Sequence, residues 1–177
     1  MQHRVYLVED EPIIAAGIVR KLEQLGYAVA GRSSSGEAAV RGIDSNPPDL
    51  VLMDIKLEGR MDGVEAAGEI RKRHDIPVVF LTAFADEATL QRATQQEPFG
   101  YIVKPFTDRE LSGAIEVALH RHALDQAIRH REERYRMLSD VLSDYAFSIR
   151  VAPDPENDQL EWSVGSSSAM FGVDLAE

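Results

Sequence analysis

The chain contains no cysteine, no long apolar run and no glycine-rich phosphate loop, and each absence removes a class of function. Without cysteine there is no disulfide framework, no thiolate nucleophile and no cysteine-ligated metal site. The first apolar run, residues 5–8, is broken at once by Glu9, Asp10 and Glu11, so we expect neither a signal peptide nor a membrane span there. The turn after it is acidic rather than glycine-rich, which argues against a dinucleotide site. We therefore expect a cytoplasmic protein.

Basic residues are also in short supply. The 19 Lys and Arg residues are outnumbered by 30 Asp and Glu residues, which gives a formal net charge of -11. Phosphate backbones are bound by surplus Lys and Arg, so we expect no nucleic-acid partner, and no basic helix-turn-helix pattern follows residue 121. The 44% of hydrophobic and 28% of charged residues are ordinary for a globular protein. A length of 177 residues allows one full domain and part of a second.

Short apolar runs alternate with helix-period stretches up to about residue 120. This pattern predicts strands at residues 5–8, 27–30, 50–53, 78–81 and 101–103, and helices at 12–25, 36–43, 64–74, 86–94 and from Asp108 onward. The strands are so short and apolar that we expect all five to be buried. Right-handed crossovers then predict an α/β fold, a doubly wound five-stranded parallel sheet with the flavodoxin-like order 2-1-3-4-5. Pro12 suits the start of one helix, and Thr107 with Glu110 forms a capping box for another.

The last of these helices has no stop signal, because neither Gly nor Pro occurs between Gly113 and Pro153. We expect an extended helix whose Leu111, Ile115 and Leu119 face the sheet. Beyond them, bulky residues follow alternating spacings of four and three, with Arg131 interrupting: Leu124, Ile128, Tyr135, Leu138, Leu142 and Tyr145. That seam favours a parallel two-stranded coiled coil, and hence a homodimer, over a single helix that folds back on its own domain.

The end of the chain changes character. Strand-like runs at 147–151 and 160–164 flank a turn-rich stretch, and about thirty residues are too few to bury a core of their own. We expect an incomplete α+β segment. The predicted organisation is therefore a first domain at 1–121, a helical connector at 122–146 and a partial domain at 147–177.

The residues that could bind a ligand or take part in a reaction follow the ends of the predicted strands. Glu9 and Asp10 follow the first strand, Asp54 the third, Thr82 the fourth and Lys104 the fifth. Ligands bind at the carboxyl ends of parallel strands, so we expect these side chains to meet. Two carboxylates about 5 Å apart repel by roughly 3 kcal/mol at an effective dielectric near 20, which calls for cations. Hard oxygen ligands select Mg²⁺, and Lys104 adds a second positive charge, which suits phosphoryl transfer with Asp54 as the nucleophile.

Other interpretations of these residues exist. A lone Asp at a strand end is more often a cap or turn residue, but capping preferences explain Asp and Thr, not Lys104. A Mg²⁺-dependent phosphatase on a similar sheet would also use Asp54, but normally has a second Asp two residues later, where this chain has Lys56. A purely structural coiled-coil protein would leave the cluster at the strand ends unexplained.

Five short motifs, in order and with suitable separations, resemble the receiver domains of two-component response regulators: Val8-Glu9-Asp10-Glu11, Leu52-Met53-Asp54-Ile55, Met61-Asp62-Gly63, Leu81-Thr82-Ala83 and Lys104-Pro105-Phe106. The resemblance covers residues 1–121. It implies that a histidine kinase or phosphotransfer protein phosphorylates Asp54, and that the domain catalyses its own phosphorylation and dephosphorylation.

The resemblance also implies roles for particular residues. Mg²⁺ would be held by Asp10, Asp54 and the backbone carbonyl of Lys56, with Glu9 acting through water. Thr82 and Tyr101 would form a switch pair that repacks the face made by the fourth helix, fifth strand and fifth helix. The Lys104–Pro105 peptide bond would be cis.

Residues 133–171 resemble the opening of a PAS sensory domain, on the strength of these residues: Tyr135, Leu138, Asp144, Phe147, Glu161, Trp162 and Phe171-Gly172. A receiver, a connector and a PAS start together resemble the N-terminal part of a hybrid sensor histidine kinase, in which the receiver controls an attached sensory or kinase module. The alternative is a stand-alone response regulator that acts by protein–protein interaction. No kinase catalytic segment is visible here, and we expect His120, His122 and His130 to be exposed connector residues.

Overall fold

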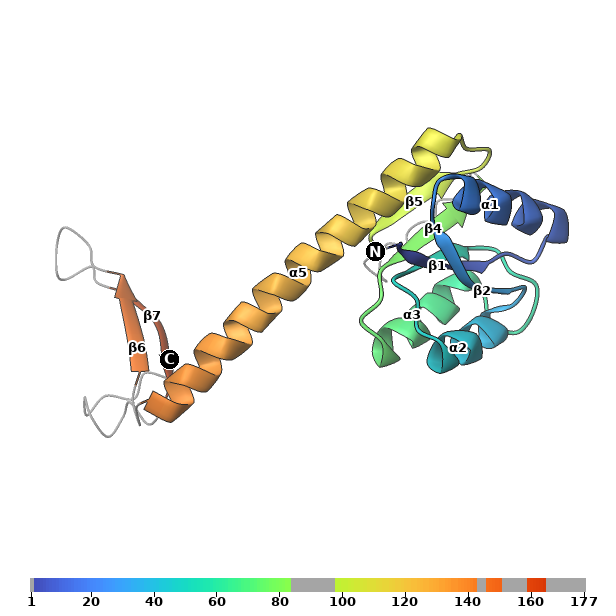
Figure 1. Cartoon of the computed structure of the whole chain (residues 1–177). Helices are drawn as coiled ribbons and strands as arrows, with labels where there is room; N and C mark the ends of the chain where they lie inside the picture. The colour runs from blue at the N-terminus through green and yellow to red at the C-terminus, as the bar shows by residue number, and fades with distance from the viewer. Residues whose placement is uncertain (1, 84–97, 143–145, 151–158, 165–177) are drawn as a thin grey trace. The chain divides into compact units, whose positions relative to one another are not determined.

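A five-stranded parallel sheet forms the centre of the first part of the chain. The computed structural model describes residues 2–83, 98–142, 146–150 and 159–164, with side chains up to residue 136. The strands are β1 (Arg4–Val8), β2 (Ala28–Ser33), β3 (Leu50–Asp54), β4 (Val78–Thr82) and β5 (Gly100–Val103). Their order is β2-β1-β3-β4-β5 and every pair is parallel, which confirms the predicted flavodoxin-like topology (Figure 1).

Four helices are described around and beyond this sheet. They are α1 (Pro12–Gln24), α2 (Gly36–Ser45), α3 (Gly63–Arg73) and α5 (Asp108–Leu142). The helix predicted at 86–94 lies outside the described residues. In the part of the chain that the structure describes, no helix is long and apolar enough to cross a membrane.

The helix starts follow from local hydrogen bonds. The capping box predicted before α5 is present, because the Glu110 N–H donates to Thr107 Oγ1 at 3.2 Å and the Thr107 N–H donates to Glu110 Oε2 at 2.7 Å. A second box opens α3, where Asp62 and Glu65 exchange hydrogen bonds of 2.9 and 3.0 Å. The Asp-x-x-Glu spacing of this box is a sequence signal for a helix start that was not among the predicted ones.

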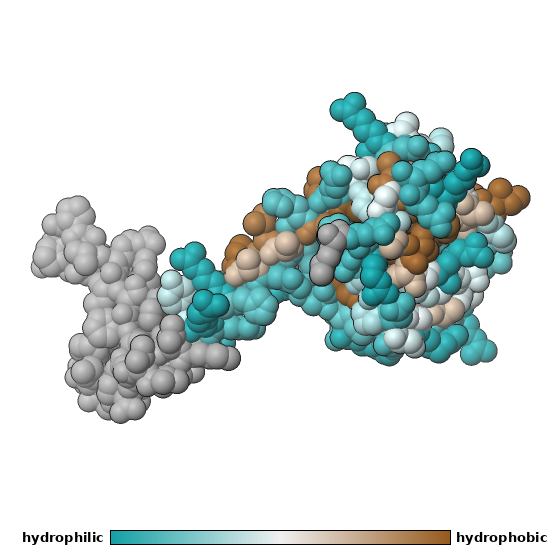
Figure 2. Space-filling view, viewed as in Figure 1, coloured by the Kyte–Doolittle hydropathy of each residue, from teal (hydrophilic) through white to brown (hydrophobic). Residues whose placement is uncertain are grey.

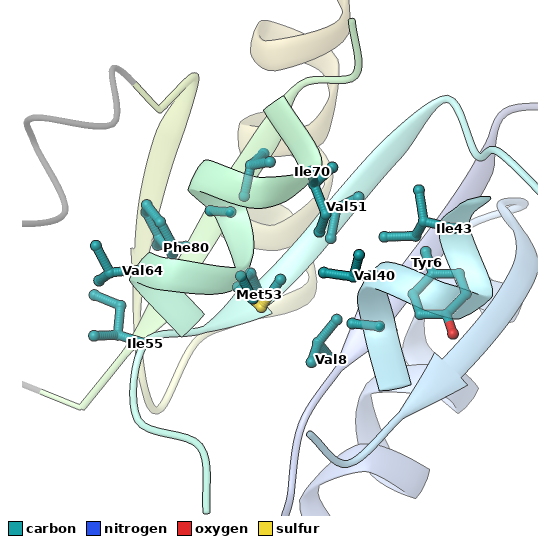
Figure 3. Packing of buried hydrophobic residues seen from close by; sticks show 14 residues of the cluster. Tyr6, Val8, Val40, Ile43, Val51, Met53, Ile55, Val64, Ile70 and Phe80 are labelled. Carbon is teal, nitrogen blue, oxygen red and sulfur yellow. The ribbon is translucent and has the colours of Figure 1, made fainter. Parts of the chain in front are cut away.

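Successive residues of the central strands point to opposite faces of the sheet, so the strands feed two separate cores. The core against α1 and α5 takes residues such as Leu7, Leu52 and Leu81. The core against α2 and α3 takes their neighbours, among them Tyr6, Met53 and Phe80, as Figure 3 shows. Each fully buried side chain of this size contributes about 1.5–3 kcal/mol to folding. Residues two positions apart on a strand share a face, so Glu9 follows Leu7 and Asp54 follows Leu52 on the side of the sheet that α1 covers.

The expectation that all five strands are buried is wrong for the two edges. β1 is almost wholly and β3 and β4 are wholly buried, but five of the six residues of β2 are half-buried and Arg32 is exposed. In β5 only Ile102 is buried. An edge strand has a neighbour on one side only, so its apolar composition does not guarantee full burial.

One of the connector histidines also differs from expectation. His122 is buried, with its ring edge-on to Phe99 at a centroid distance of 5.3 Å, and its Nδ1 lies 3.9 Å from Asp75 Oδ1. His120 and His130 are exposed as predicted. The helix therefore remains packed on the first domain for one turn beyond the Leu111, Ile115 and Leu119 stripe.

Contacts between Cα atoms group the chain into two units, Met1–Leu124 and Asp125–Glu177. In the second unit, β6 (Ala146–Arg150) and β7 (Gln159–Val164) form an antiparallel pair. The strand-like character predicted at 147–151 and 160–164 is thus present, with the bounds shifted by about one residue. The division at residues 121 and 146 stays a prediction.

Candidate functional site

Parallel register brings the carboxyl ends of four strands to one edge of the sheet. Val8 lies beside Met53, Asp54 beside Leu81, and Thr82 beside Val103. The residues that follow β1 and β5 therefore extend toward the same place as the ends of β3 and β4. This is the edge where a ligand site is expected in such a sheet.

Three carboxylates gather there. Glu9, Asp10 and Asp54 each offer an oxygen, and these oxygens all lie within 4.8 Å of one another. Glu9 and Asp54 are buried and Asp10 is half-buried. The structure thus brings together three of the predicted site residues, which lie up to 45 positions apart along the chain, in a partly dehydrated position where their mutual repulsion is strong.

Lys104 partly neutralises this group. Its Nζ donates to Glu9 Oε2 at 2.5 Å and also to Asp54 Oδ2. Lys104 follows β5 directly, and the Lys104–Pro105 peptide bond is cis. One ammonium group therefore stands between two buried carboxylates.

The pKa directions of Glu9 and Lys104 reflect a balance between burial and their pairing. Burial raises the pKa of Glu9 above its ordinary value, although the hydrogen bond and charge of Lys104 act in the opposite direction. Burial alone would lower the pKa of Lys104, but the hydrogen bonds to Asp54 and Glu9 outweigh it and the pKa is raised. The pairing keeps Lys104 charged, and one ammonium group serves a cluster of three carboxylates, so the site suits a further cation.

Backbone amides of the loop after β3 orient the acidic side chains. The Lys56 N–H donates to Asp54 Oδ1 at 2.9 Å, and the Glu58 N–H donates to Asp10 Oδ2 at 3.1 Å. Gly63 lets the chain return close to β3, because a Cβ at this position would lie 1.8 Å from the Asp54 carbonyl oxygen. Sequence reasoning gave none of these three residues such a role, since loop geometry decides which amides face a carboxylate.

Thr82 lies at the cluster and Tyr101 lies away from it. The Thr82 hydroxyl is buried and has no hydrogen-bond partner among the described residues, and Thr82 lines the same cleft as Asp54 and Lys104. Tyr101 is not part of the cleft wall; its ring stacks on Phe80 with centroids 5.9 Å apart and planes at 26°.

The cleft around the cluster has a volume of about 600 Å³ and extends along α1. Ile14, Ile18 and Lys21 line it from that helix, and Phe106 lines it from the loop after β5. Sequence reasoning did not select these residues. Their spacing of four and three places them on one face of α1, a signal that was present but equally consistent with core packing.

The donor set fits a divalent cation. Glu9 Oε1 is buried and accepts no hydrogen bond of normal geometry from the described residues, which leaves an oxygen available for a cation or its water. Carboxylate oxygens are the ligands that Mg²⁺ prefers, and Mg²⁺ is commonly held by one or two carboxylates together with waters and phosphate.

Residues 5–116 match the family described as the response regulator receiver domain. The chain belongs to this family. Receiver domains work in two-component signalling, and the acidic cluster lies at the position of their phosphorylation site.

Among curated relatives, the transcriptional regulatory protein PdtaR of Mycobacterium tuberculosis is 39% identical to this receiver-containing chain over 118 residues. The match covers 67% of this chain and 57% of PdtaR, so the chain spans little more than half the length of that relative.

Two solved structures are similar to the same region. The signal receiver domain of a modulated diguanylate cyclase from Desulfovibrio desulfuricans G20 is 40% identical, with a TM-score of 0.68, and covers 71% of this chain and 99% of its own. The receiver domain of sensor histidine kinase PA1611 from Pseudomonas aeruginosa PAO1 is 31% identical, with a TM-score of 0.62. The match covers 68% of this chain and 99% of that receiver domain. That structure has a magnesium ion coordinated in the active site cleft.

Proposed function

We propose that this receiver domain takes a phosphoryl group from a histidine kinase or phosphotransfer protein onto Asp54 in a Mg²⁺-dependent reaction. The observation that carries the proposal is the convergence of Glu9, Asp10 and Asp54 within 4.8 Å, with Lys104 bonded to two of them. A receiver that serves such a kinase acts in the cytoplasm.

The chemical step needs little beyond positioning and charge neutralisation. A carboxylate oxygen of Asp54 forms a bond to phosphorus, and the bond between phosphorus and the donor imidazole nitrogen breaks with its electron pair on that nitrogen. Lys104, already held at the Asp54 carboxylate, offsets the charge of the incoming phosphoryl oxygens. Water later attacks the acyl phosphate and releases inorganic phosphate, so the domain catalyses both its phosphorylation and its dephosphorylation.

The metal belongs beside the nucleophile. We propose Asp10, Asp54 and the backbone carbonyl of Lys56 as its ligands, with Glu9 acting through a bound water. When bound, Mg²⁺ supplies charge neutralisation at the phosphoryl oxygens. The unpartnered Glu9 Oε1 supports this set, because it is a buried carboxylate oxygen that makes no hydrogen bond to Lys104, which bonds to Oε2.

We propose Thr82 and Tyr101 as the switch residues. The buried Thr82 hydroxyl has no partner among the described residues and lines the cleft, so a phosphoryl oxygen at Asp54 can recruit it as a donor. A shift of Thr82 at the end of β4 would free space beside Phe80, on which Tyr101 stacks. The face made by β5 and α5 would then repack, while the fourth helix of the predicted switch face lies outside the described residues.

The output would pass along α5. We propose that residues 122–146 connect the receiver to a PAS-like segment at 147–177, that the chain dimerises through this connector, and that the receiver controls an attached sensory or kinase module as in a hybrid sensor histidine kinase. The antiparallel β6–β7 pair supports an α+β segment there. A stand-alone regulator that acts by protein–protein contact is the alternative, and it predicts full function without residues 125–177.

A Mg²⁺-dependent phosphatase is the second candidate, because it would use the same cluster. Lys56 stands where such an enzyme normally has an acidic residue, and its backbone N–H already holds Asp54. This candidate predicts repeated turnover of phosphate esters, whereas the receiver predicts the uptake of one phosphoryl group on Asp54.

The test uses the full chain and Asp54→Asn, incubated with acetyl phosphate with and without Mg²⁺. Intact mass should rise by one phosphoryl group only in the unmodified chain and only with Mg²⁺. Asn at position 54 keeps the size of the side chain and removes the nucleophilic oxygen. Equal mass gain in both proteins, or gain without Mg²⁺, would show that the receiver assignment of Asp54 is wrong.

A further inference from the structure

Another hollow of the receiver lies where β1 begins, whereas the acidic cluster lies where the strands end. It has a volume of about 400 Å³ and is lined by His3, Tyr27, Glu116, Leu119 and His120. His3 directly precedes β1, and Glu116 and His120 belong to α5, which Figure 1 shows passing beside the start of the chain. Two imidazoles and one carboxylate, from opposite ends of the receiver sequence, therefore line one hollow.

The spacing of Glu116 and His120 separates this hollow from an ordinary polar surface. Hydrophilic residues cover much of the face that Figure 2 shows, so a single exposed histidine or glutamate needs no explanation. Glu116 and His120 are four residues apart on α5, which places their side chains on one face, one turn from each other. Two helix residues at this spacing can bind one metal ion together.

The contacts of His3 leave its second ring nitrogen to the hollow. His3 Nδ1 lies 3.7 Å from Asp49 Oδ2, and Asp49 does not line the hollow, so Nε2 is the nitrogen available there. A carboxylate at one ring nitrogen commonly accompanies a metal at the other, because it fixes the tautomer and the ring orientation. The backbone of His3 is also held, since the Ala28 N–H donates to its carbonyl oxygen at 2.9 Å.

The side chains must turn inward to share an ion. Among the described residues, the acidic cluster is the one group of three such side chains with ligand atoms within 4.8 Å. His3, Glu116 and His120 are exposed, and exposed side chains change rotamer within nanoseconds. An ion can therefore draw the three together while β1 and α5 keep their places.

The ligand types select a different ion from that of the acidic cluster. Carboxylate oxygens suit Mg²⁺, whereas imidazole nitrogens suit Zn²⁺ and similar transition metals. Two imidazoles and one carboxylate would leave the fourth position of a tetrahedral Zn²⁺ ion to water. The wall made by the buried Tyr27 and the half-buried Leu119 limits the access of water from one side, which strengthens charge interactions in the hollow.

We propose that His3, Glu116 and His120 bind one Zn²⁺ ion, which links the start of β1 to α5. Asp49 orients His3 for this role through its Nδ1. The proposal does not rest on phosphorylation of Asp54 or on the Mg²⁺ site.

The test is a calorimetric titration of the full chain with Zn²⁺, in excess Mg²⁺ so that the acidic cluster is already occupied. We expect one Zn²⁺ per chain with a Kd of about 1–10 μM. His3→Gln, Glu116→Gln and His120→Gln should each weaken binding about tenfold or more, because each removes one ligand. Zn²⁺ should also raise the urea midpoint of the unmodified chain and leave that of His120→Gln unchanged.

His130→Gln is the matched control. His130 is an exposed histidine of the same helix, with Nδ1 3.6 Å from Glu133 Oε2, but it does not line the hollow, so its loss should change the affinity less than about twofold. Asp10→Asn should likewise leave Zn²⁺ binding intact.

Four results would overturn the proposal. They are the absence of saturable binding, equal losses in His130→Gln and His120→Gln, loss in Asp10→Asn, and full affinity in His3→Gln. The second would mean nonspecific binding to surface histidines, and the third would place Zn²⁺ at the acidic cluster. The fourth would reduce the site to the helix pair and remove the link between β1 and α5.

Discussion

Lys104 is the residue on which the electrostatics of the cluster depends. It is the cation bonded to both Glu9 and Asp54, two carboxylates whose repulsion at this separation is about 3 kcal/mol at an effective dielectric near 20. We predict that Lys104→Gln lowers the free energy of unfolding by about 1–3 kcal/mol without Mg²⁺, because it leaves buried charges unpaired. Urea denaturation should show that millimolar Mg²⁺ restores most of this loss, while phosphoryl uptake stays slow.

A matched control is Lys72→Gln. Lys72 donates to Glu69 at 2.7 Å on the surface of α3, so its loss should change stability by less than about 1 kcal/mol and should not respond to Mg²⁺. If Lys104→Gln were as mild as this control, or if Mg²⁺ stabilised both variants equally, the cluster would not be the cation site.

At the scale of elements, Tyr6 of β1 packs against β2 and α2 at two positions, Gly31 and Gly42, where the absence of a side chain leaves room for its ring. Its hydroxyl lies 2.6 Å from Ser33 Oγ, and a Cβ at Gly42 would lie 2.1 Å from that hydroxyl oxygen. We predict that Gly42→Ala destabilises the domain by about 1–3 kcal/mol, although alanine is normally the better helix former. Thermal or urea unfolding measures the effect.

Two companion variants separate crowding from helix propensity. Gly113→Ala in α5 meets nothing within 4 Å and should be neutral or stabilising by up to about 1 kcal/mol. Tyr6→Phe combined with Gly42→Ala removes the crowded oxygen and should recover part of the loss. A Gly42→Ala variant as stable as Gly113→Ala would contradict the proposed packing.

An ion-pair group links α2 to α3 and makes a prediction about pH. His74 Nε2 lies 2.7 Å from Asp44 Oδ1, and Arg73 donates to Asp44 Oδ2 at 2.9 Å. The hydrogen bond with His74, followed by that of Arg73, lowers the pKa of Asp44 below its ordinary value of 3.8. A lowered carboxyl pKa stabilises the fold above pH 3.8, and this contribution is lost as the pH falls through the lowered value.

Asp44→Asn should therefore be less stable than the unmodified chain near pH 6–7, and the difference should shrink below the ordinary carboxyl pKa of about 4. Urea midpoints of the two proteins at a series of pH values provide the measurement. A difference that stays constant across this range would mean that the Asp44 carboxylate charge contributes nothing to stability.

The same elements show what sequence reasoning can reach. The strand ends at Asp54 and Thr82 were predictable, because buried central strands are uniformly apolar and a polar residue marks where each ends. The extent of β2 was not, since Gly31, Arg32 and Ser33 become strand only by pairing with β1. The meeting of Glu9, Asp10, Asp54 and Lys104 was predictable from the strand order. The hydrogen bonds from the backbone amides of Lys56 and Glu58, and the burial of His122, depend on contacts between distant segments that no local pattern encodes.

At the scale of the whole molecule, burial indicates where the receiver is complete. Both cores draw their buried apolar residues from positions 5–118, and His122 adds one further buried side chain on α5. Among the described residues with side chains, those from 123 to 136 contribute none to either core. Folding of the first unit should therefore need α5 up to about Leu124 and nothing beyond it.

We predict that a fragment of residues 1–124 has the same urea midpoint for the receiver transition as the full chain, within about 0.5 kcal/mol, and takes up phosphoryl at Asp54. A fragment of residues 1–116 removes Ala118 and His122 from their packing and should lose about 2 kcal/mol or more. The 1–124 fragment also ends where the seam of bulky residues predicted from the sequence starts, so it should be monomeric at concentrations where the full chain dimerises. Unfolding of 1–124 at a much lower urea concentration would mean that residues beyond the receiver stabilise it, and that the two units are not independent.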